Sequence, residues 1–171
     1  MPRNVEIKAK VHDVTALRKR ARKLTGKPPQ LLLQKDIFFH VKQGRFKLRV
    51  LSPTFGQLIF YQRGNAKNAR ESNYCIYETK NPEALRQVLR TALGEKIVVK
   101  KKRCLYLLGQ TRIHIDEVEG LGNFMELEVV LKKNQSAIEG MKTCRDIMQK
   151  LDIKQKYLIS CAYADLLARK T

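Results

Sequence analysis

Apolar and polar residues alternate along several segments of the chain, beginning near its N-terminus. Val5, Ile7 and Ala9 are separated by Glu6 and Lys8, and a period of two is typical of a strand with one buried face. Similar segments, bounded by turn-forming residues, predict further strands at residues 31–41, 45–51, 57–63, 73–79, 96–108, 111–118 and 124–132. The sequence therefore predicts seven or eight mostly antiparallel strands, with a basic loop at residues 64–72.

Helical periodicity separates some of these strands. Asp13 can cap a first helix that Gly26 ends, and Asn81 can cap a second that Gly94 ends. A third helix is expected from Asn134 or Ser136 to about residue 151, and a last one over residues 157–168. The prediction is a single α+β domain over residues 1–171, whose sheet is large enough to curl toward a barrel.

The polar face of these strands is mostly ionic. Residues two apart share a face, which groups the following side chains strand by strand: Glu6, Lys8 and Lys10; Arg45, Lys47 and Arg49; Lys101 and Arg103; Arg112, His114 and Asp116; Glu126 and Glu128. One such face is usually solvated, but five faces dominated by Lys, Arg, Asp and Glu favour a curled sheet with its charged side inward. Burying these groups is costly unless an anion and a cation enter too, so the pattern predicts a polyphosphate and a divalent metal.

The composition agrees with an anionic ligand. Lys and Arg total 35 against 16 Asp and Glu, a net charge of +19, which attracts nucleic acid, acidic membranes or phosphorylated metabolites. The four cysteines have no CxxC spacing, which disfavours a zinc or redox motif. Neither a secretory signal nor a membrane-spanning stretch is evident, so a cytoplasmic protein without membrane contact is expected.

A family resemblance rests on several of these segments. VEIKAKV, QKDIFF, LIFYQR, ARESNY, KKKRCLY and above all IHIDEVEGLGNFMELEVVL resemble the CYTH superfamily of class IV adenylate cyclases, thiamine triphosphatases and inorganic triphosphatases, and are closest to the cyclase-like branch. The likeness runs from about Val5 to Ala168. It implies an eight-stranded antiparallel β-barrel, a triphosphate tunnel with flanking helices, that holds a triphosphate with Mg²⁺ or Mn²⁺.

The resemblance also implies roles for individual residues. Catalysis would involve Glu6, Lys8 and Asp116. The triphosphate would be held by Lys8, Lys47, Arg49, Arg63, Lys101, Arg103, Arg112 and, by a looser alignment, Lys156. The metal would be held by Glu6, Asp116, Glu126 and Glu128. The first glutamate of the family's ExExK motif is absent, because Asn4 stands in its place.

Three functions remain open at this point. A metal-dependent phosphohydrolase acting on an organic or inorganic triphosphate is preferred, and an adenylate cyclase making cyclic AMP from ATP comes second. The third is a non-catalytic binder of polyphosphate or nucleotide. The basic segment LRKRARK and the loop from Arg63 to Arg70 could contact nucleic-acid phosphates outside the tunnel, although non-specific binding is disfavoured. Sequence-specific recognition is not expected, since no aromatic interleaving or nucleic-acid motif accompanies them. His114 could serve as a general base, but a structural or substrate-contacting role is equally consistent with its position, so no catalytic role is assigned to it. Tyr106, Tyr157 and Tyr163 are expected to pack or to line the pocket. Lys10, Lys100 and Lys102 are expected at the surface, and the protein as a monomer or homodimer.

Overall fold

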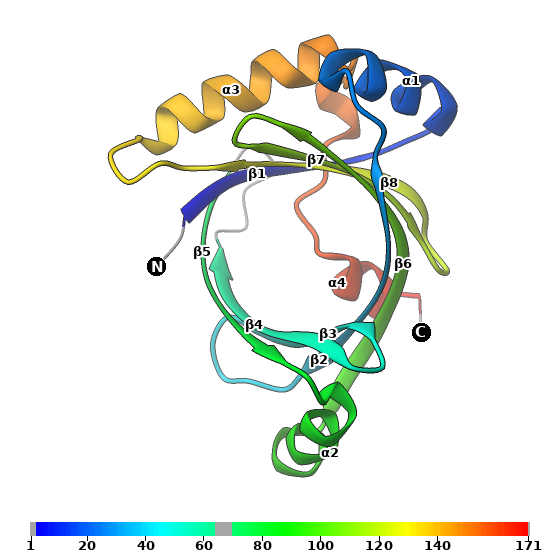
Figure 1. The fold of residues 1–171 in the computed structure, drawn as a ribbon, viewed down its shortest axis with the longest axis vertical. Helices are drawn as coiled ribbons and strands as arrows, with labels where there is room; N and C mark the ends of the chain where they lie inside the picture. The colour runs from blue at the N-terminus through cyan, green and yellow to red at the C-terminus, as the bar shows by residue number, and fades with distance from the viewer. Residues whose placement is uncertain (1–2, 64–69, 171) are drawn as a thin grey trace.

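Eight antiparallel strands form a closed barrel in the computed structural model (Figure 1). The structure describes residues 3–63 and 70–170, without the side chains of residues 63, 70 and 71. Around the barrel the strands follow the order β1-β5-β4-β3-β2-β6-β7-β8, and β8 pairs with β1. Their bounds are β1 Arg3–Lys10, β2 Gln30–Phe39, β3 Arg45–Ser52, β4 Phe55–Arg63, β5 Arg70–Thr79, β6 Glu95–Leu108, β7 Thr111–Val118 and β8 Gly122–Val130. The predicted fold class and the antiparallel strands are confirmed.

Three helices cover the outside of this barrel. α1 (Val14–Thr25) packs on β6 and β7, α3 (Ala137–Lys150) packs on β1 and β8, and α2 (Pro82–Leu93) packs across β2, β3 and β4. In Figure 1, α1 and α3 lie on one side of the barrel and α2 on the opposite side. Asp13 and Asn81 accept the expected N-cap hydrogen bonds, and Ser136, not Asn134, caps α3 in a capping box with Glu139.

The apolar face of the strands is the outer one. Val5, Ile7, Ile113, Met125 and Leu127 are almost fully buried in the cluster that α1 and α3 cover. Since side chains alternate across a strand, this packing directs the ionic positions of β1, β7 and β8 into the barrel. The helices therefore determine which face of the sheet is inside.

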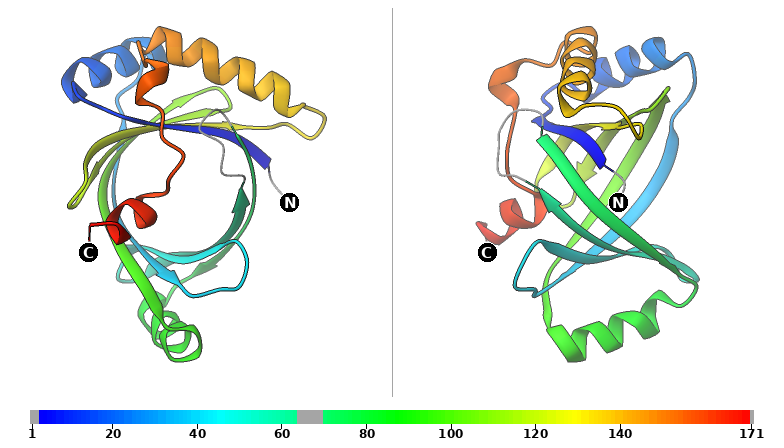
Figure 2. Two further views of the ribbon diagram at one scale, coloured as in Figure 1. Left: turned by 180° about the vertical axis from the view of Figure 1, so that it is seen from behind. Right: turned by 90° about the vertical axis from the view of Figure 1, so that its left-hand side faces the viewer.

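The C-terminal segment differs from its prediction. In place of one helix over residues 157–168, the chain forms a 3₁₀ turn, η1 (Gln155–Tyr157), then an extended stretch, then the short helix α4 (Tyr163–Ala168). Backbone bonding to β1 overrides the helical pattern: the Ile159 amide donates to the Lys8 carbonyl at 2.9 Å, and Leu158 bridges Ala9. This path carries α4 to one end of the barrel, as the side view in Figure 2 shows.

Smaller differences lie at element ends. Residues 70–72 of the predicted basic loop belong to β5, while residues 64–69 lie outside the described residues. The glycines of the β7–β8 turn have positive φ, 76° at Gly120 and 91° at Gly122, as the glycine-rich turn predicted. Among the described residues, no helix has both the length and the apolar character needed to cross a bilayer.

Candidate active site inside the barrel

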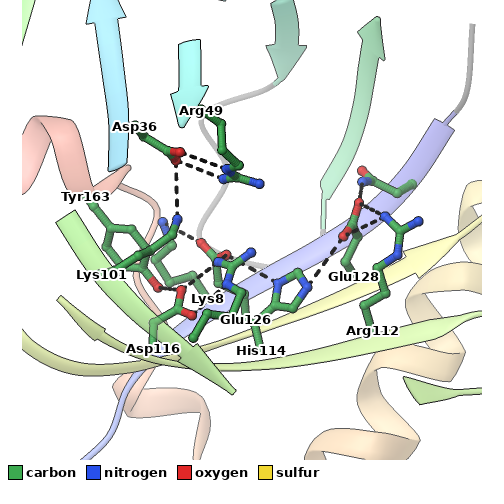
Figure 3. Close-up of polar contacts among 12 residues, drawn as sticks. Lys8, Asp36, Arg49, Lys101, Arg112, His114, Asp116, Glu126, Glu128 and Tyr163 are labelled. Atoms are coloured by element: carbon green, nitrogen blue, oxygen red, sulfur yellow. Dashed lines mark hydrogen bonds and ion pairs between the residues drawn. The ribbon is translucent and has the colours of Figure 1, made fainter. Parts of the chain in front are cut away.

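The barrel encloses a cavity of about 420 Å³ that all eight strands line. Figure 3 shows its ionic side chains, from Tyr163 at the α4 end to Arg112 and Glu128 toward the opposite end. Nine of the predicted site residues line this cavity: Glu6, Lys8, Lys47, Arg49, Lys101, Arg103, Arg112, Glu126 and Glu128. Strand alternation thus predicted which of these ionic side chains point into the barrel.

Three predicted residues have other placements. Lys156 is exposed on η1 with its ammonium group 5.1 Å from the Tyr157 ring, and it does not line the cavity. Asp116 is fully buried on β7 beneath the cavity and is 0% exposed. The side chain of Arg63 lies outside the described residues.

Asp36 on β2 is the centre of a basic cluster that the sequence analysis did not identify. Arg49 binds its carboxylate through two hydrogen bonds of 2.7 and 2.8 Å. Lys47 lies 2.8 Å and Lys101 3.4 Å from Asp36 Oδ2. One carboxylate therefore gathers three cations from β3 and β6. Strand alternation could have indicated Asp36. It lies two residues before Phe38, so both side chains share one face of β2, and both line the cavity.

Burial alters the protonation of this cluster. It lowers the pKa of Lys47 to about 7, helped by the adjacent Arg49 guanidinium, and that of Lys101 to about 8, helped by Arg103. Burial opposes ionisation of Asp36 too, yet Arg49, Lys101 and Lys47 together hold the pKa of its carboxyl well below the usual value. Asp36 is therefore ionised, and the two lysines can lose their protons near neutral pH.

Arg103 on β6 joins two carboxylates. It binds Asp116 through two hydrogen bonds of 2.7 and 2.6 Å and Glu126 through one of 2.7 Å. The hydroxyl of Tyr163 on α4 donates to the same Asp116 at 3.0 Å. With its oxygens occupied and no exposed surface, Asp116 orients Arg103 and anchors α4.

Lys8 lies where β1, β8 and the C-terminal segment meet. Its ammonium group is 3.0 Å from Glu126 and 3.8 Å from the centre of the Tyr163 ring. It also donates to the Cys161 carbonyl at 3.4 Å. Tyr163, predicted as a packing or pocket-wall residue, thus lines the cavity and bonds to a site residue. At the rim, Arg45 forms a bidentate pair with Asp165 of α4, with distances of 2.9 and 2.7 Å.

His114 separates the two carboxylates of β8. Its ring nitrogens lie 3.6 Å from Glu126 and 3.9 Å from Glu128, and buried Nδ1 has no hydrogen-bond partner among the described residues. Burial, followed by the positive charge of Arg103, lowers the pKa of His114. A neutral imidazole therefore lines the cavity between the glutamates (Figure 3).

Glu6 adds one further acid to this part of the cavity. Glu6 on β1 stands directly opposite Glu128 on β8 in the strand register, and like charges in that position repel. Arg112 offsets part of this repulsion with a 3.3 Å ion pair to Glu128. The amide of Asn4 also donates to Glu128, so the residue that replaces the family's first glutamate serves as a donor to another acid.

These carboxylates do not form a complete metal site by themselves. Among the described residues, no three Asp, Glu, His or Cys side chains converge closely enough to hold a metal ion. Magnesium, however, is commonly bound by one or two carboxylates together with substrate phosphates and water. Glu6, Glu126 and Glu128 line the cavity, so their chemistry and position fit that role, whereas Asp116 is fully buried and does not line the cavity.

The lysines predicted at the surface lie outside this cavity. Lys100 and Lys102 are exposed on the outer face of β6, as expected. Lys10 is half-buried at the α4 end, where its ammonium group donates to the Leu121 carbonyl at 2.8 Å.

The chain is similar over nearly its whole length to a known family, to a named relative and to solved structures. Residues 2–163 match the family model described as the CYTH domain. A Methanocaldococcus jannaschii protein named "Putative adenylate cyclase" is 26% identical over 170 residues, which cover 95% of this chain and 97% of that protein. The solved structure of PH1012 from Pyrococcus horikoshii OT3 has a TM-score of 0.82 at 23% identity, covering 95% of this chain and 98% of that one.

A more distant structure shares the same barrel. It comes from Hippeastrum, is described as a "putative adenylyl cyclase" that reveals a dominant triphosphatase activity, and has a TM-score of 0.65 at 14% identity. The match covers 99% of this chain and 96% of that one. At such identities the structural likeness shows the fold.

Proposed function

The chain belongs to the CYTH family, most of whose members are enzymes, and from this premise we propose a divalent-metal-dependent enzyme that acts on a triphosphate. Its reaction is hydrolysis, with release of phosphate from an organic or inorganic triphosphate. The activity described for the Hippeastrum protein is of this kind.

The basic cluster around Asp36 is the observation that carries the proposal. A single carboxylate faces Lys47, Arg49 and Lys101 inside an enclosed cavity, so this cluster keeps a positive excess when its groups are ionised. Phosphate oxygens form strong charge-assisted hydrogen bonds with such groups. A triphosphate seated here would lie between this cluster and Arg103, with the acids of β1 and β8 on the other side.

The acids opposite this cluster fit the metal. A divalent ion held by Glu6, Glu126 and Glu128 with phosphate oxygens would offset the charge that builds on the transferred phosphoryl group. The protein groups have separate tasks. Arg49 and Arg103 hold phosphate oxygens, Asp116 fixes Arg103, and a glutamate orients the water that attacks the terminal phosphorus.

Product identification tests this function. The protein is incubated with ATP, thiamine triphosphate and tripolyphosphate in the presence of Mg²⁺ or Mn²⁺, and the products are separated by chromatography. Release of orthophosphate is expected. Retained binding of the triphosphate without turnover of any of the three would contradict the enzymatic proposal and leave a binder.

A double substitution tests the acids. Glu126→Gln with Glu128→Gln should lower metal-dependent turnover by about a hundredfold or more, as loss of one transition-state charge contact does in other enzymes, while circular dichroism shows an intact barrel. Glu117→Gln with Glu119→Gln is the matched control, because this pair has the same spacing but is exposed on the β7–β8 hairpin. Equal activity in both variants would reject the metal assignment.

A second candidate is cyclisation of ATP. Its support is the name of the Methanocaldococcus relative and the lining away from α4, which includes Leu32, Leu105 and Tyr74. Such side chains suit the organic part of a nucleotide. Cyclic AMP with pyrophosphate as products of the same assay would favour this reaction over hydrolysis.

A further inference from the structure

The ionic lining of the barrel accounts for little of the protein's net charge. Among the described residues, six cationic side chains at the site face five carboxylates: Lys8, Lys47, Arg49, Lys101, Arg103 and Arg112 against Glu6, Asp36, Asp116, Glu126 and Glu128. This set contributes at most one positive charge to a chain of net charge +19. The excess that attracts anions must therefore lie mainly outside this set.

Helix α1 concentrates part of that excess. Its twelve residues include five cations and no acid, and all five are exposed: Arg18, Lys19, Arg20, Arg22 and Lys23. The apolar side of the same helix is buried on the barrel, with Leu17 2% and Ala21 0% exposed. The whole solvent face of α1, named here the α1 face, is thus basic.

The other two long helices are built differently. α3 carries Lys142, Arg145 and Lys150 together with Glu139 and Asp146, so opposite charges occur at helical spacing. α2 carries Arg86 and Arg90 with Glu83, which pairs with Arg86 at 3.7 Å. In α1, Arg18 precedes Arg22 and Lys19 precedes Lys23 by four residues, a spacing at which like charges repel.

Little in the surroundings of α1 relieves this repulsion. Asp152, at the end of α3, lies 3.4 Å from Arg20, but it also pairs with Lys154. Asp13, before the helix, is used as the N-cap and accepts the Ala16 amide at 2.9 Å. Among the described residues, no other acid forms an ion pair with the five cations of the α1 face. An ordinary solvated helix gains from mixed charges, so a face of one sign fits an anionic partner.

We propose that the α1 face binds the phosphate backbone of a nucleic acid without sequence specificity. A twelve-residue helix is about 18 Å long, and one strand of a duplex offers about five phosphates over that length, at about 3.4 Å of rise each. Because the apolar side of α1 is buried on the barrel, the helix has no hydrophobic face to insert into a membrane. This surface is outside the barrel, so its function is independent of the triphosphate reaction.

Salt-dependent binding tests this assignment. Fluorescence anisotropy is measured with labelled single-stranded RNA, single-stranded DNA and duplex DNA of one mixed sequence, from about 50 to 200 mM salt. All carry 5′-hydroxyl ends, and tripolyphosphate is present in excess to occupy the barrel. The first variant is Lys19→Gln, Arg22→Gln, Lys23→Gln. The matched control is Lys142→Gln, Arg145→Gln, Lys150→Gln on α3, because each variant removes three exposed positive charges while Gln retains helix propensity.

The two variants should differ in the slope of log affinity against log salt. If three phosphate contacts are lost, the α1 variant's slope becomes shallower by about 2 for single strands and about 3 for the duplex. The α3 variant keeps the wild-type slope. Equal slopes in both variants, or no binding by the wild-type protein at the lowest salt, would overturn the proposal. So would an α1 variant that keeps nucleic-acid affinity but loses binding to vesicles containing phosphatidylserine, since that result would assign the α1 face to lipid.

Discussion

The barrel interior and the α1 face are both rich in Lys and Arg, but only the α1 face carries a large net positive charge. Inside, each cation lies close to a carboxylate, as Lys47, Arg49 and Lys101 do around Asp36. On α1, Arg20 alone of the five cations forms an ion pair with an acid among the described residues, the exposed Asp152. Burial explains the difference, because an unpaired charge is far more costly in the interior than in water.

This contrast separates two properties that the composition combines. Net charge describes mainly the outer surface, whereas the position of a polyphosphate site depends on where strands place paired charges. A nearly neutral interior can still bind an anion, since a ligand can compete with Asp36 for its three cations. Neutralising a charge should therefore destabilise the interior and stabilise the α1 face.

The largest expected effect is at Asp36. Asp36→Asn leaves buried cations without their anion, so the free energy of unfolding should fall by about 3–5 kcal/mol, the usual cost of removing one partner of a buried pair. The loss should be greater at pH 6 than at pH 9, because Lys47 and Lys101, with pKa values of about 7 and 8 in the wild-type protein, can shed their protons at the higher pH. Guanidinium denaturation measures both.

Asp146→Asn on α3 serves as the control for this substitution. Asp146 is exposed, and a surface change of this kind alters stability by about 0.5 kcal/mol or less. Tripolyphosphate at about a hundred times its Kd stabilises a binding-competent fold by about 2.7 kcal/mol and should offset much of the Asp36→Asn loss. A decrease below about 1 kcal/mol at pH 6 would show that Asp36 does not hold the cluster.

Next in size is the contact that joins α4 to the site. Tyr163→Phe removes the hydroxyl that donates to Asp116, and a hydrogen bond to a charged group contributes about 1.5–3 kcal/mol. A loss near the lower figure is expected, because Arg103 still binds Asp116. The control is Tyr106→Phe, a buried ring of the outer core. If the two variants are equally stable, Tyr163 does not anchor α4.

Proton uptake on ligand binding offers a third comparison. Lys47 has a pKa of about 7, so at pH 8 it is mostly neutral, and an incoming polyphosphate favours its protonated form. Binding at pH 8 should therefore take up more than one proton, most of one at Lys47 and about half of one at Lys101, whose pKa is about 8, and should weaken as pH rises from 6 to 9. Calorimetric titration with tripolyphosphate in buffers of different ionisation enthalpy measures the uptake.

Lys47→Arg provides the control for that titration, since arginine stays protonated throughout this pH range. Uptake in this variant should fall to the smaller contribution of Lys101. An unchanged uptake would assign the proton to another group.

The smallest effect has the opposite sign. Lys19→Gln removes the positive charge that lies four residues from Lys23 on α1. With this repulsion relieved, the free energy of unfolding should rise by about 0.2–0.5 kcal/mol. Lys142→Gln on α3 removes a lysine four residues before Asp146 and should lower it by a similar amount. Thermal denaturation at low salt compares the two, and a loss of stability in Lys19→Gln would remove the contrast between the helices.

The sequence by itself determined the local elements and the strand faces. Caps such as Asp13 and Asn81 and alternation along β1, β3, β7 and β8 depend on neighbouring residues alone, so they could be identified without coordinates. The ionic side chains of the site followed from that alternation, and the family resemblance added the expectation of a closed barrel.

Only the tertiary structure decided how these groups pair. Asp36 meets Arg49 because β2 pairs with β3, and Asp116 meets Arg103 because β7 pairs with β6. Bonding of the C-terminal segment to β1 likewise replaced a predicted helix by an extended stretch and set Tyr163 against Asp116. Sequence patterns report which face a side chain occupies, whereas strand register and chain path determine the partner that it meets on a neighbouring element.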